Sequence, residues 1–564
     1  MGFRPGLGES DFLRLRREQI DLIDKSALIS QLVADSARVL LFPRPRRFGK
    51  TTNLSMLRYF FERSDDDRSD LFADLQVWQD EQARKHFQKY PVIWLSFKDV
   101  KFKSWDEAWN LITLQVRELF LSHQVLLNSP DLHPVERKTI EEILEQRAAP
   151  SAYYAALRSL SQWLSVHHRQ EVVLLLDEYD TPIHAAYLHG YYDQMIEFMR
   201  AFLSGGLKDN PHLYKGVVTG IMRVARESLF SGLNNLSVHS MMSEEYSTAF
   251  GFTEAEVADI CQRIGKPELL HDLRLMYNGY LAALEGSTPQ ALYNPWSVLS
   301  CIKTPSFTLK PYWVNTASDD LLRELMLRQG HALNPDFEQL LAGGEVERVL
   351  DEHVALRELD TRDDALWTFL WYAGYLKIIR VRNTRAPRPS ATFAIPNQEV
   401  RGVFTDIFLS WLTREQSSSQ FQLQLTNALL GGDAIGLERL LSRVMLTNFS
   451  YHDTGGRQPE KLYHGFVMGL LVYLEGSYEV RSNAESGYGR VDVLVKPRQA
   501  GKPGAVIELK VLYDDETIGE ALKDALNQLE EQQYETQLVA AGASPIYRYA
   551  ALFDGKKLYL VTPQ

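Results

Sequence analysis

The sequence predicts an α/β multidomain protein, with a parallel-sheet core built around a phosphate-binding loop and a smaller α/β domain near the C-terminus. Three stretches predict this class, and in each of them an apolar strand leads to polar residues that carry chemistry: residues 39–51, 172–178 and 489–510. With 564 residues, 45% of them hydrophobic and 24% charged, the chain is long enough for three or four globular domains.

Composition and charge exclude several classes of protein. The formal net charge of −12 disfavours indiscriminate coating of nucleic acid, although it is compatible with a local basic surface. The two cysteines, Cys261 and Cys301, are too few for a disulfide framework or a zinc cluster, and they predict a reducing, cytoplasmic location. Residues 1–10 lack the apolar core of a signal peptide, and no apolar run approaches the roughly 20 residues of a membrane helix.

The first stretch has the order of strand, loop and helix that binds phosphate. Residues 39–42 read as a buried strand, and Gly49, Lys50 and Thr51 stand where apolar residues at helical spacing begin. Amides at a helix N-terminus face an anion, Lys50 would reach the terminal phosphates, and the Thr51 hydroxyl would hold magnesium. The predicted nucleotide-binding residues of this loop are Arg46, Arg47, Gly49, Lys50, Thr51 and Thr52.

The loop departs from the usual motif at one position. Arg44 holds the place of the first glycine, so the loop is stiffer and more basic than a glycine loop. Three arginines beside the phosphates are compatible with this loop, but they do not replace the missing glycine in backbone terms. The alternative is a basic loop before an ordinary helix.

A second stretch favours the nucleotide site. Five consecutive apolar residues, 172–176, predict a central parallel strand that ends in Asp177 and Glu178. Asp177 would hold magnesium through water, and Glu178 would polarise the attacking water. Either motif alone is a weak signal, whereas both motifs in this order indicate nucleotide binding.

Further strands and helices complete the pattern of a doubly wound parallel sheet. They are predicted at residues 92–97, 105–147, 151–168 and 215–219. Ligands of such sheets lie beyond the carboxyl ends of the strands, and Lys50, Asp177 and Thr219 all fall there. Residues 24–26 are predicted to cap a helix that starts at Ala27.

Thr219 and Arg223 are candidates for sensing the nucleotide. Thr219 is the polar residue after an apolar strand, where it would sense the terminal phosphate and position water. Arg223 and Arg226 follow at a helical interval, and either could stabilise transition-state charge within the chain or across a subunit boundary. The alternative for each arginine is a surface salt bridge.

The rest of the chain divides where the composition changes. Residues 252–345 read as mainly helical and predict a lid over the sheet. A helix, a hairpin and a second helix then predict a winged-helix-like module: residues 366–376, 377–382, 391–395 and 398–412. Residues 377–388 hold five basic residues and no acidic one, which is typical of a wing that reaches DNA phosphates; the alternative is a solvated spacer. The polar residues 416–424 read as a boundary.

A second candidate site lies near the C-terminus. Two strands joined by a turn carry Asp492 on the first strand and Glu508 and Lys510 on the second. Glu508 and Lys510 share a face, because residues two apart in a strand point the same way. Two carboxylates can hold Mg²⁺ or Mn²⁺, and Lys510 can orient or deprotonate the attacking water. The pattern predicts metal-dependent phosphodiester cleavage.

Neighbouring helices hold weaker candidates. Glu460 is a candidate further metal ligand, and His464 lies one helical turn later, where a structural role is favoured. Gln528 and Tyr534, in a helix predicted over residues 516–534, would either touch DNA or metal-bound water, or pack in the core.

Several phrases of the sequence resemble one family closely. They are Arg-Pro-Arg-Arg-Phe-Gly-Lys-Thr at 44–51, Asp-Glu-Tyr-Asp-Thr-Pro at 177–182, Thr-Gly-Ile-Met-Arg-Val-Ala at 219–225, Ser-Gly-Leu-Asn-Asn at 231–235, Tyr-Asn-Pro-Trp-Ser at 293–297 and Pro-Tyr-Trp-Val-Asn-Thr at 311–316. Together they resemble the AAA-ATPase-like family, in which this domain is joined to a nuclease-like domain of the PD-(D/E)XK superfamily, the DUF1703 group. The departure at Arg44 is shared with that family.

The resemblance implies four parts. They are an AAA-like P-loop ATPase domain at 1–250, a helical lid at 251–350, the winged-helix-like module at 351–415 and a restriction-endonuclease-like nuclease domain at 416–564. It implies ATP and Mg²⁺ or Mn²⁺ as cofactors and DNA as partner, in defence against foreign DNA or in DNA repair. The alternative is a nucleotide switch without enzymatic activity that binds nucleic acid or protein through an inactive nuclease fold. A homo-oligomer is compatible with either hypothesis.

Overall fold

The computed structural model shows two compact units. The first comprises Met1–Leu325 and Glu347–Glu399, and the second Met326–Val346 and Val400–Gln564. The structure describes residues 3–223, 236–286, 288–313, 336–337, 339–341, 343–360, 362–382, 388–412, 418–448, 459–471, 474, 477–486, 489–513, 516–531 and 534–563. Within these ranges, none of the helices has both the length and the apolar character that crossing a bilayer requires.

A five-stranded parallel sheet forms the centre of the first unit. Its strands are β1 (Val39–Pro43), β2 (Val92–Ser96), β3 (Val172–Asp177), β4 (Leu213–Gly220) and β5 (Leu236–Val238), in the order β2-β3-β4-β1-β5. Ser96 pairs with Asp177 and Phe42 pairs with Thr219, so the carboxyl ends of four neighbouring strands meet at one edge. The predicted parallel sheet is confirmed, and β5 is a strand that the sequence pattern did not predict.

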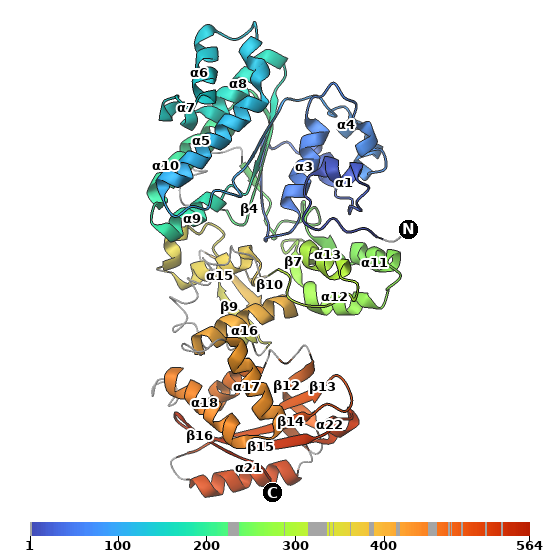
Figure 1. The fold of residues 1–564 in the computed structure, drawn as a ribbon, viewed down its shortest axis with the longest axis vertical. Coiled ribbons are helices and arrows are strands. Elements are labelled where there is room, and N and C mark those ends of the chain that lie inside the picture. The colour runs from blue at the N-terminus through green and yellow to red at the C-terminus, as the bar shows by residue number, and fades with distance from the viewer. Residues whose placement is uncertain are drawn as a thin grey trace. The chain divides into compact units, whose positions relative to one another are not determined.

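Helices cover both faces of this sheet, as a parallel sheet requires. Figure 1 shows α1 and α3 on one side and α5, α8 and α10 on the other. The helices of this part of the chain are α1 (Phe12–Arg17), α2 (Ala27–Ala34), α3 (Lys50–Phe61), α4 (Glu81–Arg84), α5 (Trp105–Ser122), α6 (Pro134–Leu144), α7 (Pro150–Tyr154), α8 (Ala156–His168), α9 (Thr181–His189) and α10 (Tyr192–Leu207). The single helical stretch predicted over 105–147 is thus interrupted between α5 and α6.

The segment predicted as a helical lid contains a small sheet as well as helices. The helices are α11 (Glu254–Arg263), α12 (Leu269–Tyr277) and α13 (Pro295–Lys303). The strands are β6 (Phe252–Thr253), β7 (Tyr280–Ala282) and β8 (Gln290–Tyr293), paired antiparallel in the order β6-β8-β7. Helices make up most of the regular structure in the described part of this segment. The small sheet was not predicted, because strands of two to four residues are too short to show a periodicity of two.

A three-stranded sheet follows, flanked by helices. Its strands are β9 (Val346–Val349), β10 (Lys377–Arg382) and β11 (Ser390–Ala394), in the order β10-β11-β9, and its helices are α15 (Asp363–Ala373) and α16 (Gln398–Leu412). Two of the described arginines of the basic hairpin form ion pairs: Arg382 pairs with Glu347 at 3.4 Å, and Arg388 pairs with Asp351 at 3.4 Å. Residues 383–387, between β10 and β11, lie outside the described residues.

The second unit is built on a mixed five-stranded sheet. Its strands are β12 (Tyr478–Ser486), β13 (Gly489–Pro497), β14 (Gly504–Val511), β15 (Ile546–Asp554) and β16 (Lys557–Val561), in chain order across the sheet. All neighbours are antiparallel except β14 and β15, which are parallel. The helices are α17 (Ser418–Gly431), α18 (Ala434–Asn448), α20 (Pro459–Leu471), α21 (Ile518–Glu531) and α22 (Thr536–Ala540).

Two predicted features of this unit differ from the structure. The polar stretch 416–424 belongs to α17 from Ser418 onward. Phe421 and Leu425, four residues apart, are buried on one face of this helix, whereas Leu423 is exposed, so the stretch is an amphipathic helix and not a linker. The helix predicted over 516–534 ends at Glu531. Its Ala525 and Leu529, four residues apart, pack on Leu494 and Val506 of the sheet.

Candidate functional site

The phosphate loop ends where α3 begins. Gly49 caps this helix in the left-handed conformation, with φ of 79°, which a glycine adopts without steric cost. Lys50 is buried, and its Nζ donates to the carbonyl oxygens of Arg44 and Pro45, both at 3.0 Å. The lysine therefore lies inside the loop, held by two carbonyls of the loop's own backbone.

Asp177 collects hydroxyl groups from three elements. Thr51 Oγ1 of α3 donates to Asp177 Oδ2 at 2.7 Å, and Thr219 Oγ1 of β4 donates to Asp177 Oδ1 at 2.7 Å. Ser96 Oγ of β2 lies 3.5 Å from Asp177 Oδ2. Asp177 is fully buried, so these hydroxyls are its solvation. The structure thus brings together Thr51, Asp177 and Thr219. Ser96 was missed, although it is the polar end of an apolar strand, the same signal that marked Thr219.

Glu178 follows Asp177 in a left-handed backbone conformation, with φ of 50°. Such a conformation is uncommon for a residue other than glycine, asparagine or aspartate, and it turns the chain sharply at the end of β3. The Glu178 carboxylate accepts a hydrogen bond from Thr181 Oγ1 at 3.2 Å. Burial lowers the pKa of Lys50, and the charges of Glu178, Asp180 and Asp177 act in the opposite direction. Lys50 therefore lies within electrostatic reach of all three carboxylates.

Arg44 does not stand beside the phosphate position. It is fully buried, and its guanidinium donates to the carbonyl oxygens of Pro43, His239 and Tyr246 at 2.9, 2.5 and 3.1 Å. It also lies 5.1 Å from the ring centroid of Phe250. The sequence is compatible with all three loop arginines beside the phosphates, whereas the structure engages the guanidinium of Arg44 with backbone carbonyls at the end of β1 and after β5.

Arg44→Ala should destabilise the first unit. Three backbone carbonyls would lose their donor in a buried place, and leaving buried polar groups unsatisfied costs about 1–3 kcal/mol or more. Burial lowers the pKa of Arg44 to about 9, which still leaves the guanidinium charged at neutral pH. We expect a lower midpoint of thermal and urea unfolding. The control is Arg84→Ala on the surface of α4, where the side chain is 41% exposed; equal midpoints for the two variants would contradict this role of Arg44.

The other loop arginines and Arg223 have different surroundings. The guanidinium carbon of Arg47 lies 3.9 Å from the ring centroid of Trp296, and the backbone carbonyl of Arg46 accepts from Asn294 Nδ2 at 3.4 Å. Trp296 thus presents a ring face to the loop. Arg223 lies at the end of a described range; its Nε is buried and has no hydrogen-bond partner among the residues that the structure describes. Arg226 lies outside the described residues.

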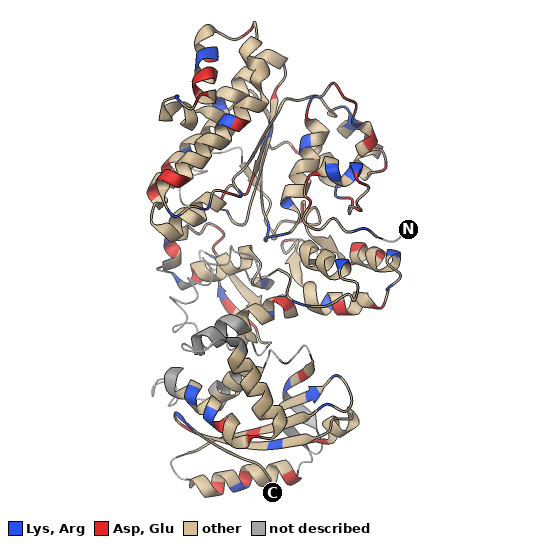
Figure 2. Ribbon diagram, viewed as in Figure 1, with Lys and Arg blue, Asp and Glu red and all other residues tan. Residues whose placement is uncertain are grey.

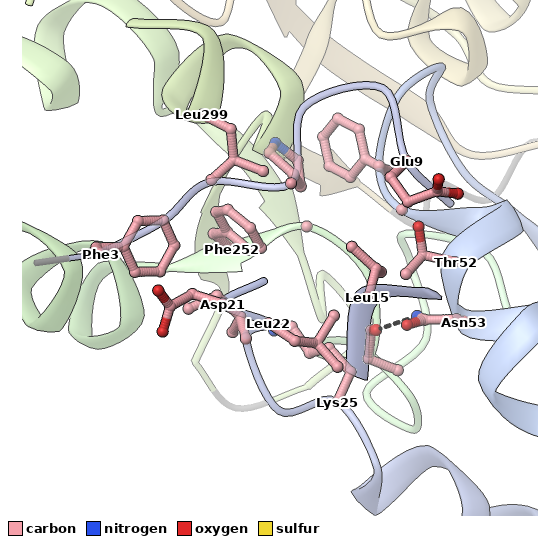
Figure 3. A pocket seen from close by; sticks show the side chains of 17 residues that line it. Phe3, Glu9, Leu15, Asp21, Leu22, Lys25, Thr52, Asn53, Phe252 and Leu299 are labelled. Atoms are coloured by element: carbon pink, nitrogen blue, oxygen red, sulfur yellow. Dashed lines mark hydrogen bonds between the residues drawn. The ribbon is translucent and has the colours of Figure 1, made fainter. Parts of the chain in front are cut away.

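A cavity of about 90 Å³ lies beside the phosphate loop (Figure 3). Gly49, Thr52 and Asn53 form its loop side, and the other walls are mainly apolar: Phe3, Leu22 and Ile23 from the N-terminal segment, and Phe252, Pro295 and Leu299 from the lid. A single water needs about 10–15 Å³, so the cavity is several times larger than a water site. The sequence did not predict this cavity, because its walls come from segments far apart in the chain.

The second candidate site lies on β13 and β14. Val493 of β13 pairs with Ile507 of β14, and Asp492 and Glu508 are the next residues along these two antiparallel strands. Asp492 Oδ2 accepts a hydrogen bond from the backbone amide of Leu509 at 2.8 Å. Lys510 Nζ lies 3.9 Å from Glu508 Oε1, as expected for residues on one face of a strand. The three predicted residues are thus brought together.

The electrostatics of this cluster favour a cation. Glu508 is buried, and its Oε2 has no hydrogen-bond partner among the described residues. Burial and the charge of Asp492 raise the pKa of Glu508 to about 8, and Lys510 offsets only part of this. Two oxygen ligands that repel each other in a buried place fit a hard divalent cation.

Metal affinity at this site should therefore depend on pH. Because Glu508 must lose its proton to bind a cation, the apparent Mn²⁺ affinity should rise about tenfold per pH unit up to about pH 8 and then level off. In the metal-free protein, the stability of the fold changes with pH in the opposite direction. The raised pKa stabilises the fold at low pH, and this stabilisation is lost as pH rises through about 8. Calorimetric titration with Mn²⁺ from pH 6 to 9 measures the first effect, with Glu479→Gln on β12 as control. A flat affinity below pH 8 would contradict it.

The neighbouring candidates have mixed outcomes. His464 Nε2 lies 3.0 Å from the backbone carbonyl of Asp492, which fits the structural role expected for it. Burial and the charges of Glu508 and Asp492 raise the pKa of Tyr534 to about 12, so this phenol lies within electrostatic reach of the site. Gln528 Oε1 is buried without a partner in the described part of the chain. The side chain of Glu460 lies outside the described residues.

Comparison with known proteins finds a family match for two parts of the chain. Residues 6–230 match the family model described as a predicted AAA-ATPase, and residues 458–562 match that of the PD-(D/E)XK nuclease superfamily. A protein of Azotobacter chroococcum mcd 1, described as "Uncharacterized protein in vnfD 5'region", is 26% identical over 501 residues, which cover 87% of this chain and 86% of the relative. The resemblance found in the sequence is confirmed: the chain carries an AAA-ATPase-like domain over residues 6–230 and a PD-(D/E)XK nuclease-superfamily domain over residues 458–562.

Proposed function

We propose that this protein binds and hydrolyses ATP in its first unit and cleaves DNA with a metal-dependent nuclease site in its second. Defence against foreign DNA or DNA repair would use such a combination. The observation that supports the proposal is the pair of half-buried Asp492 and buried Glu508, with Lys510 on the face of Glu508. One oxygen of Glu508 has no hydrogen-bond partner in the described part of the chain. A carboxylate loses favourable solvation when it is buried, and a surface that only binds a partner, without catalysis, gains nothing from that loss.

In the first unit, each candidate residue has a role that its position supports. Lys50 would exchange its loop carbonyls for the β and γ phosphates. Mg²⁺, when bound by Thr51 and Asp177, supplies neutralisation of phosphate charge. Glu178 would take up the water proton, and Thr219 would hold that water in line. Arg223 would stabilise charge on the transferred phosphate.

The cavity beside Gly49 and Thr52 would hold the nucleobase (Figure 3). A planar base loses little by leaving water for apolar walls such as Phe252 and Leu299, while the phosphates need the amides of the loop. An apolar cavity next to a phosphate loop therefore fits a nucleotide better than inorganic phosphate alone.

In the second unit, Asp492 and Glu508 would hold one or two divalent cations. When bound, Mg²⁺ or Mn²⁺ supplies a polarised phosphate and a water of lowered pKa. Lys510 would stand next to that water and offset charge at the scissile phosphate. His464 holds the Asp492 backbone in place, and Tyr534 would contact the nucleic acid or the metal-bound water.

The alternative function is a nucleotide-dependent switch that binds DNA or protein and does not cut. Figure 2 shows Lys and Arg interspersed with Asp and Glu along the described ribbon. The basic hairpin follows this pattern, because Arg382 and Arg388 are paired with acidic residues. DNA contact by this hairpin remains a proposal, and its strength would depend on breaking those pairs.

Incubation of the purified protein with plasmid and linear DNA separates these functions. The reactions contain Mg²⁺, Mn²⁺ or EDTA, each with and without ATP, and phosphate release is measured in parallel. Cleavage that requires the metal supports the nuclease, and phosphate release supports the ATPase. Nucleotide binding without cleavage under any condition would favour the switch.

A further inference from the structure

Arg47 links the phosphate loop to the lid. It stands three residues before Lys50, and its guanidinium carbon lies 3.9 Å from the ring centroid of Trp296, near the start of α13. The next loop residue, Phe48, packs edge-on against Tyr280 of β7 with a centroid distance of 5.0 Å. A movement of this loop therefore changes its side-chain contacts with the lid.

Glu399 accepts hydrogen bonds from residues of the lid, including Ser297, which follows Trp296 in the chain. It is fully buried at the second position of α16, and its carboxylate accepts from Ser297 Oγ at 2.8 Å and from the Tyr312 and Trp313 amides at 2.7 and 2.9 Å. Burial raises its pKa to about 7, while those donors and the charge of Arg47 act in the opposite direction. Arg47 is thus one of the groups that favour a negative charge at Glu399.

The chain before α16 is anchored to the lid as well. Asn397 Nδ2 donates to the carbonyl of Asn278 at 2.9 Å. Gly279 has φ of 106°, and a Cβ there would lie 2.2 Å from the carbonyl oxygen of Pro396, so the two backbones touch. From Val400 onward, α16 belongs to the second unit. The first turn of α16 is therefore the place where the lid holds the chain that leads to the nuclease domain.

We propose that Arg47, Trp296 and Glu399 form a relay that reports phosphate occupancy of the loop to the first turn of α16. The relay rests on the proposed binding of ATP. In the structure, Arg47 lies on Trp296 and supports the buried charge of Glu399. Nucleotide phosphates compete for the same guanidinium, because they carry more charge and accept several hydrogen bonds.

The consequence follows from the electrostatics of burial. When Arg47 turns to the phosphates, Glu399 keeps its hydrogen bonds but loses a nearby cation, so its ionised form is less stable. Its hold on the Tyr312 and Trp313 amides then weakens, and the first turn of α16 opens more often. Coupling between two sites is reciprocal, so any change that removes the charge of Glu399 should in turn strengthen nucleotide binding.

Hydrogen exchange of the peptide that contains Tyr312 and Trp313 tests the relay. Wild-type protein, Glu399→Gln and the matched control Glu254→Gln, on α11 of the same lid, are compared with and without a non-hydrolysable ATP analogue and Mg²⁺. We expect the analogue to speed exchange at these amides about fivefold in the wild type and the control, and not in Glu399→Gln. We also expect Glu399→Gln to bind the analogue about fivefold more tightly by calorimetry.

A second variant guards against a failure of Glu399→Gln to fold. Trp296→Leu removes the ring face that holds Arg47, so it should raise affinity for the analogue in the same direction. No binding of the analogue to the wild type would overturn the proposed ATP site and the relay with it. Binding with unchanged exchange at Tyr312 and Trp313, or with the same response in Glu399→Gln, would overturn the relay alone. Unchanged or weaker binding by Trp296→Leu would also overturn it.

Discussion

Asp492→Asn should remove metal binding and DNA cleavage together. The variant keeps an oxygen that can accept from the Leu509 amide, so the strand pair is preserved, but it loses the charge that makes the site a cation ligand set. We expect cleavage to fall by at least about a hundredfold, the size of effect seen when one group that stabilises a transition state is removed. Calorimetric titration with Mn²⁺ and a plasmid-cleavage time course measure the two losses in the same preparation.

Lys510→Met separates metal binding from chemistry. Both carboxylates remain, and Glu508 loses its neighbouring cation, so Mn²⁺ should still bind while cleavage is lost. Lys502→Met, in the exposed turn between β13 and β14, is the matched control and should cleave normally. ATP turnover should survive all three changes, because its residues lie in the other unit. Unimpaired cleavage by Asp492→Asn would place the active site elsewhere.

Glu178→Gln should bind ATP and hydrolyse it slowly. Glu178 would take up the proton of the attacking water, and loss of a general base lowers turnover by about 10²–10⁴-fold. The amide keeps the size of the side chain and an oxygen that can accept from Thr181, so the turn after β3 is preserved. Phosphate release measures turnover, and equilibrium binding of a fluorescent ATP analogue measures affinity.

Lys50→Ala gives the opposite pattern and completes this test. Without the ammonium group the loop loses its contact to the phosphates, so binding itself should fail while the fold persists. Glu171→Gln is the control, since Glu171 precedes β3 at the end away from Asp177 and is 39% exposed. Turnover by Glu178→Gln at the wild-type rate would assign the base to another residue, and unchanged affinity of Lys50→Ala would contradict the phosphate-loop assignment.

The sequence by itself determined the placement of candidate site residues that are close to one another in the chain. Gly49, Lys50 and Thr51 are neighbours in the chain, so a helix that starts there must present them together. Glu508 and Lys510 share a face because a strand has a period of two. The parallel sheet followed from apolar strands separated by helices, and its strand ends placed Asp177 and Thr219 at one edge before any contact was known.

Only the tertiary structure decided what depends on contacts between distant segments. Arg44 belongs to the basic loop by its sequence position, and its guanidinium is engaged by the carbonyls of His239 and Tyr246, about two hundred residues later. The acidic partners of Arg382 and Arg388 come from outside the hairpin, and the lid sheet pairs strands too short to show a pattern. Such pairings depend on packing and on the satisfaction of buried charges and carbonyls, and neither is a property of any one stretch of sequence.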